Sequence, residues 1–193
     1  MKICILLAPG FEEVEALAPL DLLRRAGLDT TTVSVSEKCV TGSHGITVVA
    51  DSLCTDVDPQ NFDAVIFPGG MPGSLNLDSS DFTNKIIDSV LKKKGRIAAI
   101  CAAPLILGRR GLLIGKKATC FPGFERELTG ATVIDSPSSQ TETSLQPTEW
   151  NPLLFLEKSS FLCSPANKLY RRLKWHQNII ISPSDALNAE ILY

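Results

Sequence analysis

The chain has 193 residues, and its 19 lysines and arginines nearly balance 21 aspartates and glutamates to give a net charge of −2. This length suits one α/β domain with a sizeable core, and the charge lacks the positive excess of a nucleic-acid-binding protein. No apolar run is long enough to span a membrane. A signal peptide would need a longer apolar stretch before the acidic residues Glu12, Glu13 and Glu15. We therefore expect a cytoplasmic protein with no nucleic-acid or membrane partner.

Six cysteines are scattered along the chain, at positions 4, 39, 54, 101, 120 and 163. They lack the close pairs of a zinc site, and a chain of this length does not suggest a disulfide scaffold. The cysteine pattern therefore predicts free thiols in a reducing compartment and no metal site.

Short apolar runs alternate with helical patterns up to residue 134. Apolar residues at helical spacing predict a helix over residues 14–26 that ends at Gly27, and residues 82–94 form an amphipathic pattern with a cationic last turn. Apolar and β-branched runs predict strands over residues 3–8, 30–35, 46–50, 62–67, 97–100, 118–121 and 131–134.

This alternation predicts an α/β fold. Strands that alternate with helices imply right-handed crossovers and a mainly parallel sheet with helices on both faces. The reactive loops of such sheets gather at the carboxyl ends of the strands. Three loops qualify here, over residues 9–15, 68–73 and 101–104.

The segment 96–110 is the centre of this organisation. A buried strand runs into a helix whose first turn contains Pro104, which is tolerated there because its missing N–H costs nothing. Cys101 lies at the junction, where free amide N–H groups and the helix dipole favour a thiolate. Such sites lower a thiol pKa from about 8.5 toward roughly 3.5–7.5. A packed core cysteine is the alternative, since free Cys is among the most buried residue types.

The first loop offers a carboxyl partner for Cys101. Acidic residues stabilise the start of a helix, and this surface role suits Glu12 and Glu13. Glu15 shares its helix face with apolar neighbours, which favours partial burial. A buried carboxyl beside a thiol would share a proton with it, so we expect a thiolate and a neutral Glu15 that donates and shuttles protons.

The second loop offers backbone amides. Gly69 and Gly70 expose N–H groups with no side chain in the way, and the amides of Gly70 and Ala102 are the expected donors to an oxyanion above Cys101. A double glycine by itself is usually only a turn.

Together these loops resemble the DJ-1/ThiJ/PfpI family of the class I glutamine amidotransferase-like superfamily. The matching motifs, in the order and spacing of the family, are P-G-F-E-E-V-E-A (9–16), F-P-G-G-M-P-G (67–73), A-I-C-A-A-P (99–104) and A-T-C-F-P-G-F-E (118–125). The resemblance covers residues 1–137. It implies a flavodoxin-like three-layer sandwich, usually a homodimer, with no cofactor, with Cys101 on a nucleophile elbow and with Glu15 as its carboxyl partner.

The resemblance also implies a range of functions. Members are described as glyoxalases and deglycases, as oxidative-stress sensors or chaperones, and in one branch as proteases. The leading expectation is a cysteine-dependent glyoxalase or deglycase that acts on methylglyoxal-type 2-oxoaldehydes or their glycated adducts. The alternative is a non-enzymatic stress sensor or chaperone that uses the same reactive cysteine.

Two positions depart from the family pattern. Protease-like members carry His directly after the nucleophile, where this chain has Ala102, so peptidase activity is not expected. One branch carries His where this chain has Phe121, which leaves Glu15 and water to move protons. His44 lies in a Gly-Ser-His-Gly turn, where a solvated loop residue is the simpler interpretation. Similar members bind an anion near this turn, so His44 is a minor substrate-site candidate.

The resemblance stops after Pro137. Relatives continue with a peptide such as V-V-T-D-G-N-L-I-T, whereas this chain reads S-S-Q-T-E-T-S-L-Q over residues 138–146. A one-base shift in a coding sequence for the first peptide yields the second. We therefore predict a family domain over 1–137 and a frame-shifted tail over 138–193, with the last elements aberrant and a sheet edge exposed. A genuine extension that binds a partner is the alternative.

Overall fold

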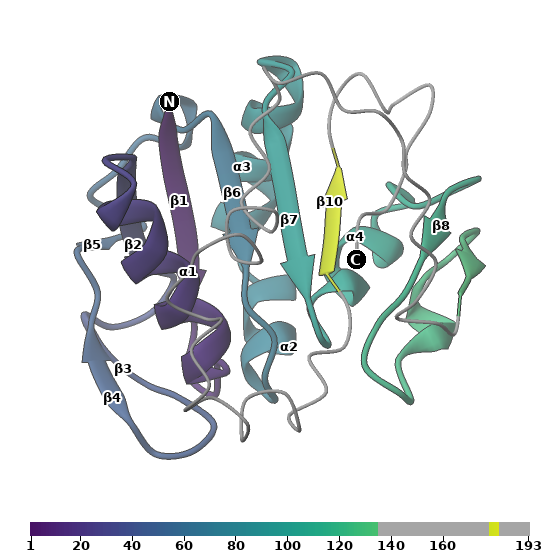
Figure 1. Ribbon diagram of the computed structural model, residues 1–193, viewed down its shortest axis with the longest axis horizontal. Helices are drawn as coiled ribbons and strands as arrows, with labels where there is room; N and C mark the ends of the chain where they lie inside the picture. The colour runs from purple at the N-terminus through teal and green to yellow at the C-terminus, as the bar shows by residue number, and fades with distance from the viewer. Residues whose placement is uncertain (135–177, 182–193) are drawn as a thin grey trace, which may run out of the picture.

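The centre of the protein is a six-stranded sheet in the order β10-β7-β6-β1-β2-β5 (Figure 1). The computed structural model describes residues 1–134 and the backbone of residues 178–181. Five strands run parallel, and β10 pairs with β7 antiparallel. The bounds are Lys2–Leu7 for β1, Asp29–Ser34 for β2, Ser52–Leu53 for β5, Ala64–Phe67 for β6, Arg96–Ile100 for β7 and Asn178–Ile181 for β10. The predicted mainly parallel α/β fold is confirmed.

Helices cover both faces of this sheet, as Figure 1 shows for α1 and α3. Successive side chains of a strand point to opposite faces, so Ile3 and Ile5 of β1 pack in one cluster with Ala16 of α1, whereas Leu6 packs in the other cluster with Ile86 of α3. The helices are α1 (Glu13–Arg25), α2 (Gly73–Asp78), α3 (Asp81–Lys92) and α4 (Pro104–Arg109). None of the helices in the described part of the chain is long and apolar enough to cross a bilayer.

Two small sheets flank the main one. An antiparallel hairpin joins β3 (Cys39–Thr41) to β4 (Thr47–Val49), and β8 (Lys117–Ala118) pairs in parallel with β9 (Thr132–Val133). The strands predicted near residues 46–50, 118–121 and 131–134 therefore form, but outside the main sheet. The sequence analysis did not predict β3, β5, α2 or the two 3₁₀ turns η1 (Pro59–Asn61) and η2 (Glu125–Glu127). Each is too short to show a hydrophobic period.

The predicted boundary at residue 137 and most of the predicted frame-shifted tail lie outside the described residues. The edge of β7 is paired with the backbone of residues 178–181. This segment contains the isoleucine run of the tail, and such β-branched residues favour strands.

The order of the central strands places the candidate loops together. β1, β6 and β7 are neighbours and run parallel, so their carboxyl ends meet at one edge of the sheet. The loop after β1, the loop after β6 and the turn after β7 therefore lie side by side.

Candidate active site

Backbone hydrogen bonds hold the loop after β1 and the loop after β6 together. The Glu12 amide donates to the Gly69 carbonyl at 2.9 Å, and the Gly73 amide donates to the Gly10 carbonyl at 3.1 Å. The approach is so close that a Cβ on Gly70, whose φ is +88°, would lie 2.6 Å from the backbone of Phe11. Only glycine fits at this contact, which explains the double glycine in the second loop.

Cys101 lies on a sharp turn between β7 and α4. Its φ is +59°, in the left-handed region that non-glycine residues rarely adopt and that often marks a functional site. The Phe121 amide donates to the Cys101 carbonyl at 2.8 Å and supports the turn. The amides of Ala102 and Gly70 both donate to the sulfur of Cys101. The two amides expected as oxyanion donors thus point to the candidate nucleophile.

Glu15 forms a hydrogen-bonded pair with the half-buried thiol of Cys101. The Gly69 amide fixes the carboxylate, because it donates to Glu15 Oε2 at 2.8 Å. A Cβ on Gly69 would lie 2.6 Å from both Cys101 Cβ and Glu15 Oε2. The absence of a side chain at Gly69 is therefore what lets the acid and the thiol meet.

The pair resists carrying two negative charges. Burial raises the pKa of Glu15 to about 7; the nearby charge of Glu12 adds to this rise, and the Gly69 amide opposes it. Burial and the charge of Glu15 raise the pKa of Cys101 to about 12, against the amides of Ala102 and Gly70. Near neutral pH the pair therefore carries at most one negative charge.

The predicted fall in the pKa of the Cys101 thiol is wrong for this arrangement. The prediction counted the amides and dipole at the start of α4, but not the burial of the sulfur or the carboxylate beside it. These two effects outweigh the amides. The raised pKa of Glu15 agrees with the expected proton sharing, but the charge rests mainly on the carboxylate and not on the sulfur.

His44 lies against a different carboxylate. Its backbone amide donates to Glu13 Oε1 at 2.8 Å, and its Nδ1 lies 3.0 Å from Glu13 Oε2. Among the described residues, the other side-chain partners of His44 are Glu12 and Ser43. The ring is 68% exposed, so the solvated-loop interpretation fits, and these contacts join His44 to the loop after β1 rather than to the thiol.

Glu13 is a residue whose role the sequence analysis missed. It was expected at the surface, yet its side chain is only 3% exposed. Burial would raise its pKa, but hydrogen bonds from the His44 side chain and from the amides of His44 and Ile46 lower the pKa to about 2. A Cβ on Gly42 would lie 2.5 Å from Glu13 Cγ. The glycine at position 42 was therefore the available sign in the sequence that a buried side chain packs against this turn.

The described residues contain one group with metal-ligand spacing. Donor atoms of Glu12, Glu13 and His44 lie within 4.8 Å of one another. The Glu13 oxygens already accept hydrogen bonds from His44, Ile46 and Ser43. These bonds account for the cluster, and we assign no metal to it.

The chain matches known proteins over its first three quarters. Residues 1–150 match the DJ-1/PfpI family, which extends beyond the boundary predicted at residue 137. The chain is 43% identical over 142 residues to protein DJ-1 homolog B of Arabidopsis thaliana, a match that covers 70% of this chain and 32% of that protein. It is 33% identical over 134 residues to a deglycase of Pyrococcus abyssi, covering 69% of this chain and 80% of that enzyme. The chain thus spans about a third of the length of the Arabidopsis relatives.

Solved structures agree with these matches. The crystal structure of a cysteine-to-alanine mutant of a DJ-1 superfamily protein from Salmonella typhimurium has a TM-score of 0.64 and 36% identity, and the match covers 70% of this chain and 75% of that one. Drosophila melanogaster DJ-1beta has a TM-score of 0.65 and 33% identity over the same shares. The fold, the motifs and these relatives together show that the chain belongs to the DJ-1/PfpI family.

Proposed function

We propose that the protein is a glyoxalase or deglycase that converts methylglyoxal-type 2-oxoaldehydes, or their early glycated adducts, without a cofactor. The observation that carries this proposal is the Cys101–Glu15 pair, with the Gly70 and Ala102 amides at the sulfur. Similarity to archaeal proteins named deglycases, at 33–37% identity, supports the same reaction class.

The first step is attack by sulfur on the aldehyde. The ionised Glu15 takes the thiol proton while Cys101 Sγ bonds to the aldehyde carbon, and the C=O bond becomes an oxyanion. The amides of Gly70 and Ala102 stabilise that negative charge. Protonation of the oxygen gives a hemithioacetal, and Glu15 is again a carboxylate.

The second step moves hydrogen within the substrate. Glu15 removes the proton from the former aldehyde carbon, which gives an enediolate, and returns a proton to the neighbouring ketone carbon. The hydroxyl proton passes from the former aldehyde oxygen to the former ketone oxygen, so that a thioester of a 2-hydroxy acid forms. Water then hydrolyses the thioester, which releases lactate from methylglyoxal and restores the thiol. A base works best when its pKa lies near the working pH, and the pKa of Glu15, about 7, meets this condition.

Lactate formation from methylglyoxal by the purified protein tests the proposal. We expect Cys101→Ala to abolish turnover. Cys39→Ala is the matched control, because Cys39 is also a free cysteine but is exposed on β3. A Cys101→Ala protein with the wild-type rate would exclude this mechanism.

A redox sensor or chaperone is the second candidate, and the raised pKa of Glu15 supports it. A neutral Glu15 can donate a hydrogen bond to an oxidised sulfur, which would hold Cys101 as a sulfinate after reaction with peroxide. Intact-mass analysis during peroxide titration separates the two functions. Two added oxygens on Cys101 without any lactate formation would favour the sensor.

We also propose that the protein forms a homodimer in a reducing, cytoplasmic environment. The outer face of α1 and the β3–β4 hairpin carry the exposed apolar side chains of Val14, Ile46 and Val49, and such residues favour an interface. The five cysteines within the described residues are free thiols. Sedimentation velocity tests the dimer, with Val14→Glu as the variant expected to dissociate it.

A further inference from the structure

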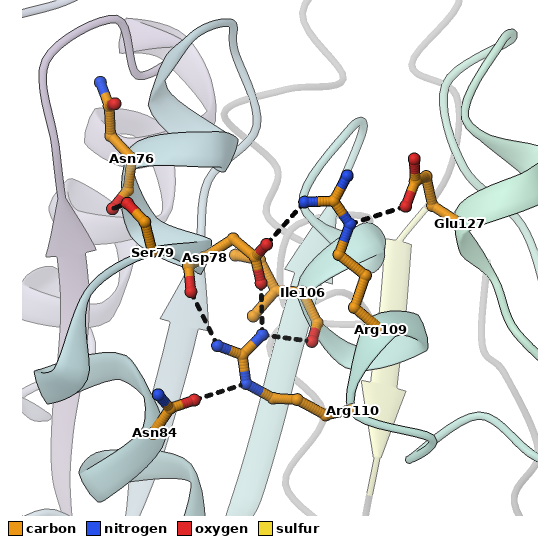
Figure 2. Close-up of polar contacts among 8 residues, drawn as sticks. All are labelled: Asn76, Asp78, Ser79, Asn84, Ile106, Arg109, Arg110 and Glu127. Atoms are coloured by element: carbon orange, nitrogen blue, oxygen red, sulfur yellow. Dashed lines mark hydrogen bonds and ion pairs between the residues drawn. The ribbon is translucent and has the colours of Figure 1, made fainter.

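Figure 2 shows an ion-pair network that ties the far ends of α2 and α4 together. Asp78, the last residue of α2, accepts hydrogen bonds from Arg109 Nη1 at 2.7 Å and from Arg110 Nη1. Arg110 Nη2 also donates to the backbone carbonyl of Asp78 at 2.9 Å. Arg109 Nε donates in addition to Glu127 Oε2 in η2, at 2.6 Å. One carboxylate of α2 therefore holds two consecutive arginines at the end of α4.

The Asp78–Arg110 contact is the more buried part of this network. The two side chains are 15% and 19% exposed, against 39% and 35% for Arg109 and Glu127. Arg110 also donates to the Asn84 side chain at 2.8 Å and to the Ile106 carbonyl at 2.7 Å. A planar guanidinium that satisfies several acceptors at once fixes orientation as well as distance.

Both helices begin at the candidate active site. The Ser74 amide in α2 donates to the Gly70 carbonyl at 2.9 Å, and the Leu105 amide in α4 donates to the Ala102 carbonyl at 3.1 Å. The two residues whose amides reach the Cys101 sulfur are thus bonded into the first turns of α2 and α4.

Each helix has only six residues. A helix of that length is not stable by itself and depends on its tertiary contacts. At 1.5 Å per residue, about 9 Å of helix separates each active-site end from the network. A change in the relative position of the far ends would therefore be transmitted to the amide-bearing ends.

We propose that Asp78 is a positioning residue that locks α2 against α4 and thereby sets the two amides of Gly70 and Ala102 around the sulfur of Cys101. This role rests on the proposed use of Cys101 as a nucleophile. Asp78 lies outside the site, but it would fix the relative positions of the Gly70 and Ala102 amides, which belong to two separate loops.

The test compares Asp78→Asn with Glu127→Gln. Each variant removes one carboxylate partner of Arg109, but only Asp78 links α2 to α4. The first readout is the rate of Cys101 alkylation by iodoacetamide against pH, followed by peptide-resolved mass spectrometry. The second is kcat and KM for lactate formation from methylglyoxal.

Removal of a whole oxyanion donor costs about 10²–10³ in kcat, and displaced donors cost a part of this. We expect Asp78→Asn to lower both the alkylation rate of Cys101 at neutral pH and kcat about tenfold, with KM within about twofold, because the amides act mainly on the developing charge. We expect Glu127→Gln to change each value less than about twofold.

Two results would overturn the proposal. One is an Asp78→Asn protein that unfolds at a lower temperature but keeps the wild-type alkylation profile of Cys101. The other is an equal loss in Asp78→Asn and Glu127→Gln. If Asp78→Asn does not fold, Arg110→Lys replaces it. Lysine keeps the positive charge but cannot donate the two guanidinium hydrogen bonds to Asp78, and we expect the same fall in alkylation rate and kcat. The alkylation rates test the role of Asp78 even if the wild type forms no lactate. The absence of lactate would count against the proposed function alone.

Discussion

Two carboxylates in the first turn of α1 lie in opposite environments. Glu13 and Glu15 are both withdrawn from solvent, yet the pKa of Glu13 is lowered to about 2 and that of Glu15 is raised to about 7. Glu13 accepts hydrogen bonds from two backbone amides and from the ring of His44. Glu15 accepts one backbone hydrogen bond, from Gly69, and faces a thiol. The number of donors, and not burial alone, decides the charge of each carboxyl.

The comparison separates a structural role from a chemical one. Glu13 stays ionised at neutral pH, and its charge serves to hold the loop after β3 against α1. Glu15 gains and loses its proton near neutral pH, which is the property of a proton carrier. Variants at these two positions and at their neighbours should therefore fail in different ways.

The largest expected effect follows Glu15→Gln. Loss of a general base typically costs about 10²–10⁴ in rate, so we expect a fall in kcat of that size. Wild-type kcat should rise with pH through about 7, because the ionised carboxylate is the base. Steady-state lactate assays from pH 5 to 9 measure both effects, and a Glu15→Gln enzyme with the same rise would contradict the assignment.

Gly69→Ala should have the next largest effect. The new Cβ would lie 2.6 Å from both Cys101 Cβ and Glu15 Oε2, so the acid and the thiol must separate. We expect kcat to fall more than tenfold, since errors in the placement of reacting groups cost up to about 10²-fold. Gly27→Ala is the control, because its φ of +75° strains the backbone of alanine while leaving open space around Cβ, far from the site. Equal losses of activity in both variants would show that strain, and not the pair, is responsible.

Glu13→Gln should act mainly on stability. Loss of the charge-assisted hydrogen bonds to the buried Glu13 carboxylate costs about 1–3 kcal/mol, which urea denaturation at pH 7 can measure. The folded-state pKa of Glu13 is depressed, so its stabilisation is present above about pH 4.5 and is lost as pH falls toward 2. The gap between wild type and variant should therefore shrink in acid, and a gap that does not change with pH would contradict this account.

Glu15 carries the opposite pH dependence of stability. Its folded-state pKa is raised, so the folded state binds more protons than the unfolded state between about pH 4.5 and 7. Wild type should lose stability relative to Glu15→Gln as pH rises through this range. Denaturation of the same variant thus checks the sign independently of any catalytic assay.

The smallest expected effect belongs to Glu12→Gln. The charge of Glu12 contributes to the raised pKa of Glu15, so its removal should move the rise in kcat to lower pH. The plateau should stay within about twofold of wild type, because Glu12 does not touch the thiol. A pH profile that does not move would show that the Glu12 charge is screened by solvent.

The sequence predicted the central strands of the sheet and the two long helices because these elements carry a clear pattern. The apolar runs of β1, β6 and β7 and the periodic α1 and α3 appear where they were expected. The pairing of Cys101 with Glu15 was predicted from the meeting of loops at the carboxyl ends of parallel strands and from family resemblance. Periodicity did not contribute, since no local pattern joins residues so far apart in the sequence. Strand β3 and helix α2 escaped prediction because elements of three to six residues show too little periodicity.

The properties of the site were harder to predict than its members. Glu13 is covered by a loop that lies 31 residues away in the sequence and donates hydrogen bonds to it. No local sequence pattern predicts such a contact. The pKa of Cys101 went the other way from the prediction because burial and a neighbouring carboxylate outweigh two amides. A sequence shows which titratable residues are present, but the pKa of each one depends on its tertiary contacts.

The adjacency of β1, β6 and β7 also bears on how the chain acquires its chemistry during folding. Glu15 and Gly69 meet across 54 residues of sequence, and such non-local contacts form late, after loops have closed. Before the middle of the sheet exists, Cys101 is therefore an ordinary cysteine with no acid beside it and no amides around it. Labelling of this one thiol during refolding would report the moment at which the central strands assemble.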